Sequence, residues 1–213
     1  MDTSRDIILG NIRQSLKRYV LDVTTEQSLS YGLKHPTQHI RPDWEQDNLQ
    51  RFIQQLESVV GTYEYIDSIA DFPNAVLRFL EQHQLRLEIL CDAQLKVLCP
   101  WPSELTLQHR AAQAGDSTSV SYAFAGVAET GSIAMLSSEN NPTSFNFLPD
   151  NHIVLLEQKN IVSHMEDVWT TLRHQARTPR TINIITGPSR TADIEQTIQL
   201  GAHGPRHLHV VIV

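Results

Sequence analysis

The sequence contains only two cysteines, Cys91 and Cys99, and they do not have the spacing of a CxxC motif. Two thiols do not fill by themselves the four-ligand shell of an iron–sulfur cluster or of a closed zinc site. We therefore interpret both residues as reduced, mostly buried thiols. We expect this chain to hold no metal and no cofactor of its own.

Nucleotide-binding fingerprints are also absent. The sequence has no GxGxxG motif, no P-loop and no GxSxG elbow, which argues against NAD, ATP and serine-hydrolase chemistry. Its 17 Lys and Arg residues are outnumbered by 24 Asp and Glu residues, giving a formal net charge of −7. Because no basic cluster is available to neutralise phosphates, we expect no nucleic-acid partner.

Long apolar runs are missing as well. Residues 1–20 lack the uninterrupted apolar stretch of a signal peptide, and no run is long enough to span a bilayer. We therefore expect a cytoplasmic protein without a membrane span.

What is present is the composition of a globular α/β protein, with 213 residues of which 40% are hydrophobic. An amphipathic helix is predicted over about residues 4–19, with Ile8, Ile12 and Leu16 on one face. A polar loop over residues 22–43 is predicted to separate this helix from the core, so we expect it to pack loosely or against another molecule. We divide the chain into an N-terminal extension, residues 1–45, and an α/β domain, residues 46–213.

Alternating strands and helices follow. Strands are predicted at 62–66, 87–90, 132–136, 153–156, 182–185 and 208–213, and helices at 49–60, from 71, at 161–174 and at 191–200. Residues 91–131 show no clear pattern. The last five elements alternate β-α-β-α-β with strands that are apolar on both faces, which is typical of a parallel sheet. We predict an open, mainly parallel sheet with helices on both faces, in which the strands near 153, 182 and 208 run parallel.

The sharpest candidate site is the turn after the strand at 182–185. It contains Gly187, Pro188, Ser189, Arg190 and Thr191, and Asp193 follows closely. Ligands of open α/β sheets lie beyond the carboxyl ends of the strands, where free N–H groups of a helix start suit a phosphate or carboxylate. The alternative is a turn without a ligand, because Asp193 and Glu195 already complement the helix dipole and repel an anion.

A second candidate is Glu129, which is followed by Thr130 and Gly131 and lies among small, apolar residues. A carboxylate in such surroundings suits a nucleophile or a general base whose pKa is raised by partial burial. The alternative is a turn in which Glu129 caps backbone N–H groups.

A third segment contains His207 and His209, which lie on the same face of a predicted strand, as alternate metal ligands do. No carboxylate in the segment supplies a third ligand. This segment precedes its strand, so we expect it at the opposite end of the sheet from Gly187. We therefore favour a turn at Gly204-Pro205 over a metal site.

The polar loop over residues 137–150 is the fourth segment. Long loops in compact domains are often functional, and this one is predicted to share a sheet edge with Ser189 and Arg190. The alternative is an apolar plug that closes the core with Phe145 and Phe147.

Four motifs occur in a fixed order: Ala128-Glu129-Thr130-Gly131, Leu148-Pro149, Gly187-Pro188-Ser189-Arg190-Thr191-Ala192-Asp193-Ile194-Glu195, and Gly201-Ala202-His203-Gly204-Pro205. In order and spacing they resemble the LUD-domain family, and within it the lactate-utilisation protein C (LutC) branch. The resemblance covers residues 120–213 and extends to the opening Ser4–Leu9. Ala202 departs from the family pattern, in which Val is expected.

The resemblance implies a fold similar to the NagB/RpiA/CoA-transferase superfamily. It also implies a link with two iron–sulfur partner subunits in the oxidation of L-lactate to pyruvate, with the cluster ligands on those partners. It implies no established catalytic residues. Our first hypothesis is an accessory subunit of such a system. The second is a CoA-transferase-like enzyme or a binder of a small anionic acyl or phosphosugar ligand, and the third is a structural domain without a ligand.

Overall fold

The computed structural model describes residues 3–17, 22–35, 40–139, 141–174, 179–192, 198–200 and 204–213. The chain forms two compact units, Met1–Pro42 and Asp43–Val213. None of the helices in the described residues has the length and apolar content needed to cross a bilayer.

The first unit contains two helices, α1 (Ser4–Ser15) and α2 (Val23–Lys34), and neither has a buried residue. The predicted first helix is confirmed, with a capping box between Thr3 and Asp6. The polar loop predicted over 22–43 is wrong, because α2 lies there. Its ends explain the helix: the side chain of Asp22 caps it by accepting from the N–H of Thr25, and Lys34 complements the dipole in its last turn.

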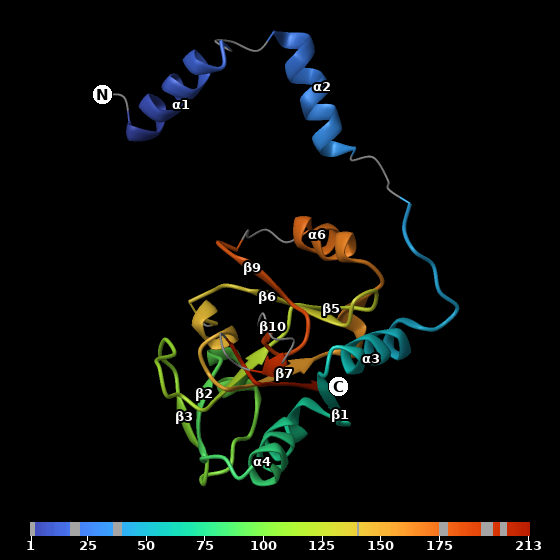
Figure 1. The fold of residues 1–213 in the computed structure, drawn as a ribbon, viewed down its shortest axis with the longest axis vertical. Helices are drawn as coiled ribbons and strands as arrows, with labels where there is room; N and C mark the ends of the chain where they lie inside the picture. Colours follow the sequence, from blue (N-terminus) through green and yellow to red (C-terminus); the bar gives the residue numbers. More distant parts are fainter. Residues whose placement is uncertain are drawn as a thin grey trace. The chain divides into compact units, whose positions relative to one another are not determined.

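The second unit is built on a six-stranded sheet in which every pairing is parallel. The strand order is β1-β12-β7-β4-β2-β3. Its strands are β1 (Thr62–Tyr65), β2 (Glu88–Cys91), β3 (Thr106–Gln108), β4 (Thr118–Tyr122), β7 (Asn151–Leu156) and β12 (His207–Ile212). The predicted mainly parallel α/β sheet is therefore confirmed (Figure 1).

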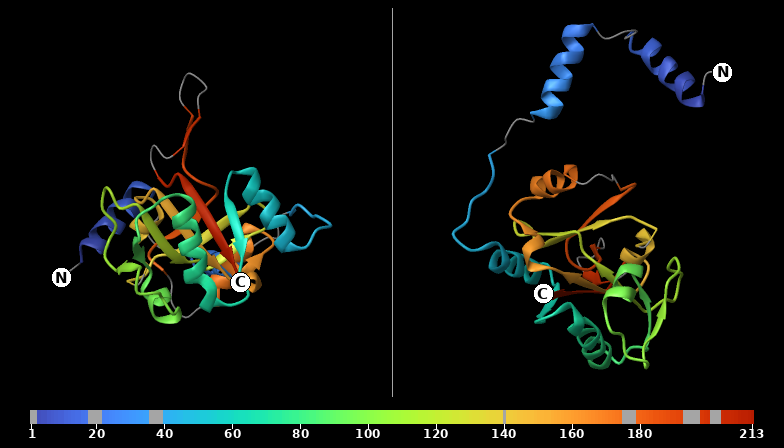
Figure 2. Two further views of the ribbon diagram at one scale, coloured as in Figure 1. Left: turned by 90° about the horizontal axis from the view of Figure 1, so that it is seen from below. Right: turned by 180° about the vertical axis from the view of Figure 1, so that it is seen from behind.

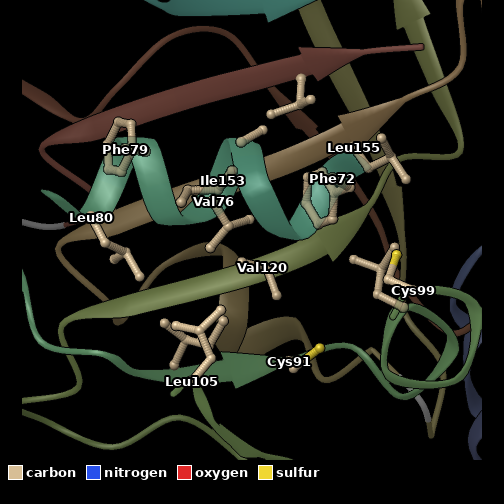
Figure 3. Packing of buried hydrophobic residues seen from close by; sticks show 14 residues of the cluster. Phe72, Val76, Phe79, Leu80, Cys91, Cys99, Leu105, Val120, Ile153 and Leu155 are labelled. Atoms are coloured by element: carbon tan, nitrogen blue, oxygen red, sulfur yellow. The ribbon is translucent and has the colours of Figure 1, made fainter. Parts of the chain in front are cut away.

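One face of this sheet is covered by α4 (Phe72–Gln82) and the short α5 (Ala93–Leu98). Helix α4 has Pro73 in its first turn and places Phe72, Val76 and Leu80, all fully buried, on its inner face. These side chains pack against Val120 of β4 and neighbouring residues of β7 (Figure 3). Among the described residues this cluster is the largest of four buried hydrophobic clusters.

The other face is covered by α3 (Asn48–Ser58) and by a second sheet with the order β8-β5-β6-β9. The strands of the second sheet are β5 (Ala125–Val127), β6 (Ser132–Leu136), β8 (Ile161–Val162) and β9 (Ile182–Ile185). Ile133 and Met135 of β6 face the parallel sheet, whereas Ala134 packs with Val168 of α6 (Met165–Arg173). Seen from behind, the layers run α6, second sheet, parallel sheet, α4 (Figure 2, right).

Two predictions for the C-terminal third are wrong. β9 was expected beside β7 and β12, but it pairs antiparallel with β6 in the second sheet. A helix was expected over 191–200, but β10 (Arg190–Ala192) and β11 (Ile198–Leu200) form an antiparallel pair. Periodicity does not distinguish the sheet to which a short apolar strand belongs, and β-branched residues in the 191–200 segment favour strands.

One boundary also differs. The helix predicted over 161–174 begins at Met165, because Ile161 and Val162 form β8 beside β5. The remaining predicted strands at 62–66, 87–90, 132–136, 153–156 and 208–213 are confirmed within two residues at each end.

Candidate functional site

Two of the predicted motif segments press against the end of α3. Gly131 (φ +65°) leaves no room for a side chain, because a Cβ there would lie 2.3 Å from the backbone nitrogen of Leu56. Gly187 (φ +74°) is equally crowded, with the carbonyl oxygen of Val59 at 2.5 Å from such a Cβ. Both turns therefore require glycine for its left-handed backbone and for its missing side chain.

A chain of hydroxyl groups joins these two turns. The Thr130 and Ser132 hydroxyls are 2.6 Å apart, and Ser132 is 2.7 Å from the Thr186 hydroxyl. Ser132 is fully buried and cannot pair with water, so the neighbouring hydroxyls serve as its hydrogen-bond partners. The structure thus brings the Glu129–Gly131 and Gly187–Arg190 segments together, as a tightly packed joint between β6 and β9.

Glu129 is half-buried at the start of α6. Its backbone N–H donates to the carbonyl oxygen of Ser163 (3.0 Å), and its carboxylate accepts from the N–H of Met165 (3.5 Å), the first residue of the helix. This is the contact of a carboxylate at a helix N-terminus, where negative charge is favoured. The geometry thus favours the capping alternative, although at α6 and not at the strand that follows.

The Gly187–Arg190 turn does not lie at the carboxyl edge of the parallel sheet, which was the premise of the predicted anion site. The N–H of Ser189 donates to the carbonyl oxygen of Pro205 (2.8 Å), just before β12 begins. The turn therefore lies at the amino edge, because β9 belongs to the other sheet. The expectation that the Gly187 and Gly204 turns lie at opposite ends is also wrong, since a Cβ on Gly204 would lie 3.1 Å from that of Ser189.

Two groups that were expected to donate hydrogen bonds to an anion are therefore not available: the N–H of Ser189 and the free N–H groups of a helix start. The N–H of Ser189 is already bonded, and no helix begins at Arg190, which starts β10. Pro188 is buried and Arg190 is exposed. The backbone of Thr191 is in β10, and Asp193 lies outside the described residues.

His207 and His209 lie on the α4 face of β12, on the same side as predicted. The Nδ1 atom of His209 is 2.8 Å from the Thr62 hydroxyl, and that of His207 is 2.8 Å from the side-chain oxygen of Asn151. Burial lowers the pKa of His209 to about 4, and it also lowers the pKa of His207. Among the described residues no three His, Cys, Asp or Glu side chains are grouped to hold a metal.

The loop over residues 137–150 closes the core at Phe145, as one of its two alternatives predicts, but Phe147 of that alternative is exposed. Phe145 is fully buried against Leu90 and Ala112, and its carbonyl oxygen accepts from the Ser119 hydroxyl (2.7 Å). The beginning of the same loop, however, lines a cleft at the carboxyl edge of the parallel sheet.

That cleft has a volume of about 370 Å³ and was not predicted from the sequence. Asp92 follows β2, Tyr122 ends β4, and Asn160 follows β7, so three parallel strands deliver polar residues to one place. Polar side chains of other elements complete the lining: Gln94, Ser138, Asn141 and Thr171. The position matches the general rule that ligands bind beyond the carboxyl ends of parallel strands.

Asp92 is the buried acid of this cleft, with an exposed fraction of 3%. Its carboxylate accepts from the N–H of Gln94 (2.7 Å) and so caps α5. Burial raises the pKa of Asp92, and hydrogen bonds from Gln94 and Leu95 together with nearby His109 offset this only in part. Burial also raises the pKa of Tyr122, whose hydroxyl donates to Glu157.

Asn141 is the second buried polar residue of the cleft, at 6% exposure. Its side-chain oxygen is buried and has no hydrogen-bond partner among the described residues. Buried polar atoms are almost always paired in folded proteins, so this one calls for an explanation.

Comparisons with known proteins come from sequence and from fold. Residues 49–213 match the family described as the LUD domain. "Lactate utilization protein C" of Geobacillus kaustophilus is 26% identical over 85% of this chain and 88% of its own length. The protein of the same name from Oceanobacillus iheyensis is 20% identical over 99% of this chain and 98% of its own. A crystal structure of a DUF162 family protein from Deinococcus radiodurans has a TM-score of 0.60 at 17% identity, covering 81% of this chain and 99% of that one.

Proposed function

Because the chain belongs to the LUD-domain family, we propose that it takes part in lactate utilisation as an accessory, non-redox subunit. The observation that carries this proposal is similarity along most of the chain to proteins named Lactate utilization protein C. In the proposed system L-lactate is oxidised to pyruvate in the cytoplasm, and the electrons pass to iron–sulfur partner subunits.

The chemistry of the two thiols supports the non-redox part of the proposal. Cys91 is fully buried and Cys99 is 6% exposed. Burial raises the pKa of Cys91 to about 12 and that of Cys99 to about 11, which disfavours the thiolate that a cluster requires. Neither residue therefore fits a role as a cluster ligand.

Growth on L-lactate tests this proposal. A strain of the native host that lacks the gene should fail to grow on L-lactate and should recover when the gene is restored. Cys91→Ala and Cys99→Ala should restore growth equally well, because neither thiol carries electrons. Affinity purification of the restored protein should also recover iron–sulfur subunits. Normal growth of the deletion strain, or a stoichiometric cluster in the purified chain, would contradict the proposal.

A second candidate function is a CoA-transferase-like enzyme or a binder of a small anionic acyl or phosphosugar ligand at the Gly187–Arg190 turn. One observation favours it: Arg190 is exposed and follows the buried Gly187-Pro188 turn by two residues. A guanidinium is the side chain best suited to paired bonds with a carboxylate or phosphate. Thr130 and Gly131 would complete such a site through the hydroxyl chain.

A further inference from the structure

The cleft at the carboxyl edge lies at the opposite edge of the sheet from the Gly187–Arg190 turn, and the proposed function does not use it. Its volume of about 370 Å³ falls within the range of roughly 300–1,000 Å³ that is usual for small-molecule sites. Asp92 and Asn141, both more than nine-tenths buried, line it. The cleft therefore has the size and the buried polar groups of a built binding site.

The two buried groups are both hydrogen-bond acceptors. The Asn141 oxygen has no donor among the described residues. The Asp92 carboxylate accepts from the backbone at Gln94 and Leu95, and its two oxygens offer about four acceptor positions, so it can accept further donors. A ligand that carries O–H groups would supply the donors that these oxygens need. The amide of Asn160 and the hydroxyl of Thr171, which also line the cleft, can each donate and accept hydrogen bonds. The hydroxyl groups of a ligand do the same and would pair with them.

The charge of the lining excludes anions. Among its described residues there is no Lys, Arg or His, and Asp92 is the one carboxylic acid. The nearby Lys159 forms an ion pair with Glu157 at 2.5 Å. An anion entering the cleft would meet a buried acid and no cationic side chain in the lining, since His109 lies near Asp92 but outside the lining. Phe124 and Leu136 add apolar surface against which the C–H groups of a ligand can pack.

From these observations we propose that the carboxyl-edge cleft binds a small, uncharged polyhydroxylated molecule of monosaccharide size, held by Asp92 and Asn141 as acceptors. L-Lactate, pyruvate and phosphorylated compounds are excluded from it by charge. The cleft is thus a site for a second molecule, which is distinct from the substrate of lactate oxidation.

The test uses amide NMR of the full chain with five probes. D-Glucose and D-ribose are uncharged polyols, D-gluconate and L-lactate are anions, and D-glucosamine is a cation. At least one uncharged polyol should shift the amides of Asp92, Phe124 and Asn141 and reach saturation. D-Gluconate should bind at least about tenfold more weakly, a difference of about 1.4 kcal/mol.

Two variants locate the binding. Asp92→Asn should weaken polyol binding by about tenfold or more, and Asn141→Ala should do the same if the first variant does not fold. Glu57→Gln, which removes an exposed carboxylate on α3, is the matched control and should bind as the unchanged chain does. The proposal is overturned if an anion binds as tightly as the polyols or more tightly, or if D-glucosamine binds more tightly. It is also overturned if neither polyol reaches saturation, or if both cleft variants bind polyol as the unchanged chain does.

Discussion

At the scale of single residues, the glycines of the family motifs act through packing. Gly131 and Gly187 both have a left-handed backbone, and both lie so close to the end of α3 that a Cβ atom would overlap with it. Motif residues of this kind are often taken for ligand-binding positions because a glycine also lets a ligand approach the backbone. Here the approaching backbone belongs to the protein itself.

Gly131→Ala and Gly187→Ala should therefore destabilise the protein severely. A left-handed residue costs about 1–2 kcal/mol, and the overlap with α3 adds to it, so we expect a loss of about 3 kcal/mol or more. Gly115→Ala is the matched control, because Gly115 has φ +94° but open space around its Cβ position. Urea unfolding compares the three variants, and equal losses at Gly115 and Gly131 would show that crowding contributes nothing.

His152 makes the stability of the protein dependent on pH. It is completely buried, its Nε2 atom lies 3.0 Å from the Ser121 hydroxyl, and burial lowers its pKa to about 3. The folded pKa lies below the unfolded value of about 6.5, so the unfolded chain binds the extra proton. Stability is then fully present above about pH 6.5 and is lost as the pH falls toward the folded pKa.

In that window each such histidine removes about 1.4 kcal/mol of unfolding free energy per pH unit. His209, with its pKa lowered to about 4, contributes in the same direction. Denaturant unfolding between about pH 7 and about pH 5 measures the slope, and His152→Gln should reduce it by up to about 1.4 kcal/mol per pH unit, leaving the part that His209 and His207 contribute. A slope that is unchanged in this variant would assign the acid sensitivity to other groups.

Of the residues that form the joint between β6 and β9, the sequence identified Thr130, Gly131 and Gly187 but not the central Ser132, and it did not identify the cleft. Thr130 and Gly187 belong to motifs that are recognisable in the sequence, because small and hydroxyl-bearing residues there interrupt apolar strands. Asp92 follows a correctly predicted strand, and a polar residue at that position is the signal that was available. It was missed because the cleft is completed by Asn141 and Thr171, which only the tertiary fold brings near.

At the scale of elements, the sequence predicts that a strand exists more reliably than where it pairs. β7 is buried along its whole length and β12 is buried from Leu208 onward, and both contain runs of Val, Leu or Ile. Their parallel pairing follows from burial on both faces. β9 has a similar composition, yet all four of its residues are only half-buried and it pairs with β6. The choice between the two sheets depends on contacts distant in sequence, which local pattern does not contain.

The strand β10 changes what is expected of Arg190. Because no helix begins there, an anion would be held by the guanidinium with little help from backbone N–H groups. The second candidate function predicts that Arg190→Ala abolishes the binding of phosphate and L-lactate measured by calorimetry. The unfolding free energy should change by no more than about 0.5 kcal/mol, since the residue is exposed.

Arg173→Ala, at another exposed arginine, is the control and should bind anions as the unchanged chain does. If Arg190→Ala unfolds the protein while anion binding is not measurable in the unchanged chain, Arg190 has a structural role and the second candidate function is wrong.

At the scale of the whole molecule, the hydrophobic residues of the two units are used differently. The second unit buries Phe52, Phe72, Ile153 and many other side chains completely. In the first unit no residue of α1 or α2 is buried, and Ile7, Ile8, Ile12 and Leu16 are all exposed. The helical periodicity of α1 is visible in the sequence, but periodicity alone does not say whether the apolar face finds a partner.

Deleting residues 1–42 should therefore leave the second unit folded. Side chains that are exposed in the folded chain contribute little to its unfolding free energy, so we expect a change of about 1 kcal/mol or less. At this chain length that corresponds to a shift of roughly 2–4 °C in Tm. Thermal unfolding followed by circular dichroism measures the shift, and amide NMR spectra show whether the resonances of residues 49–213 keep their positions. Loss of cooperative unfolding on deletion would mean that α1 and α2 contribute to the core of the second unit.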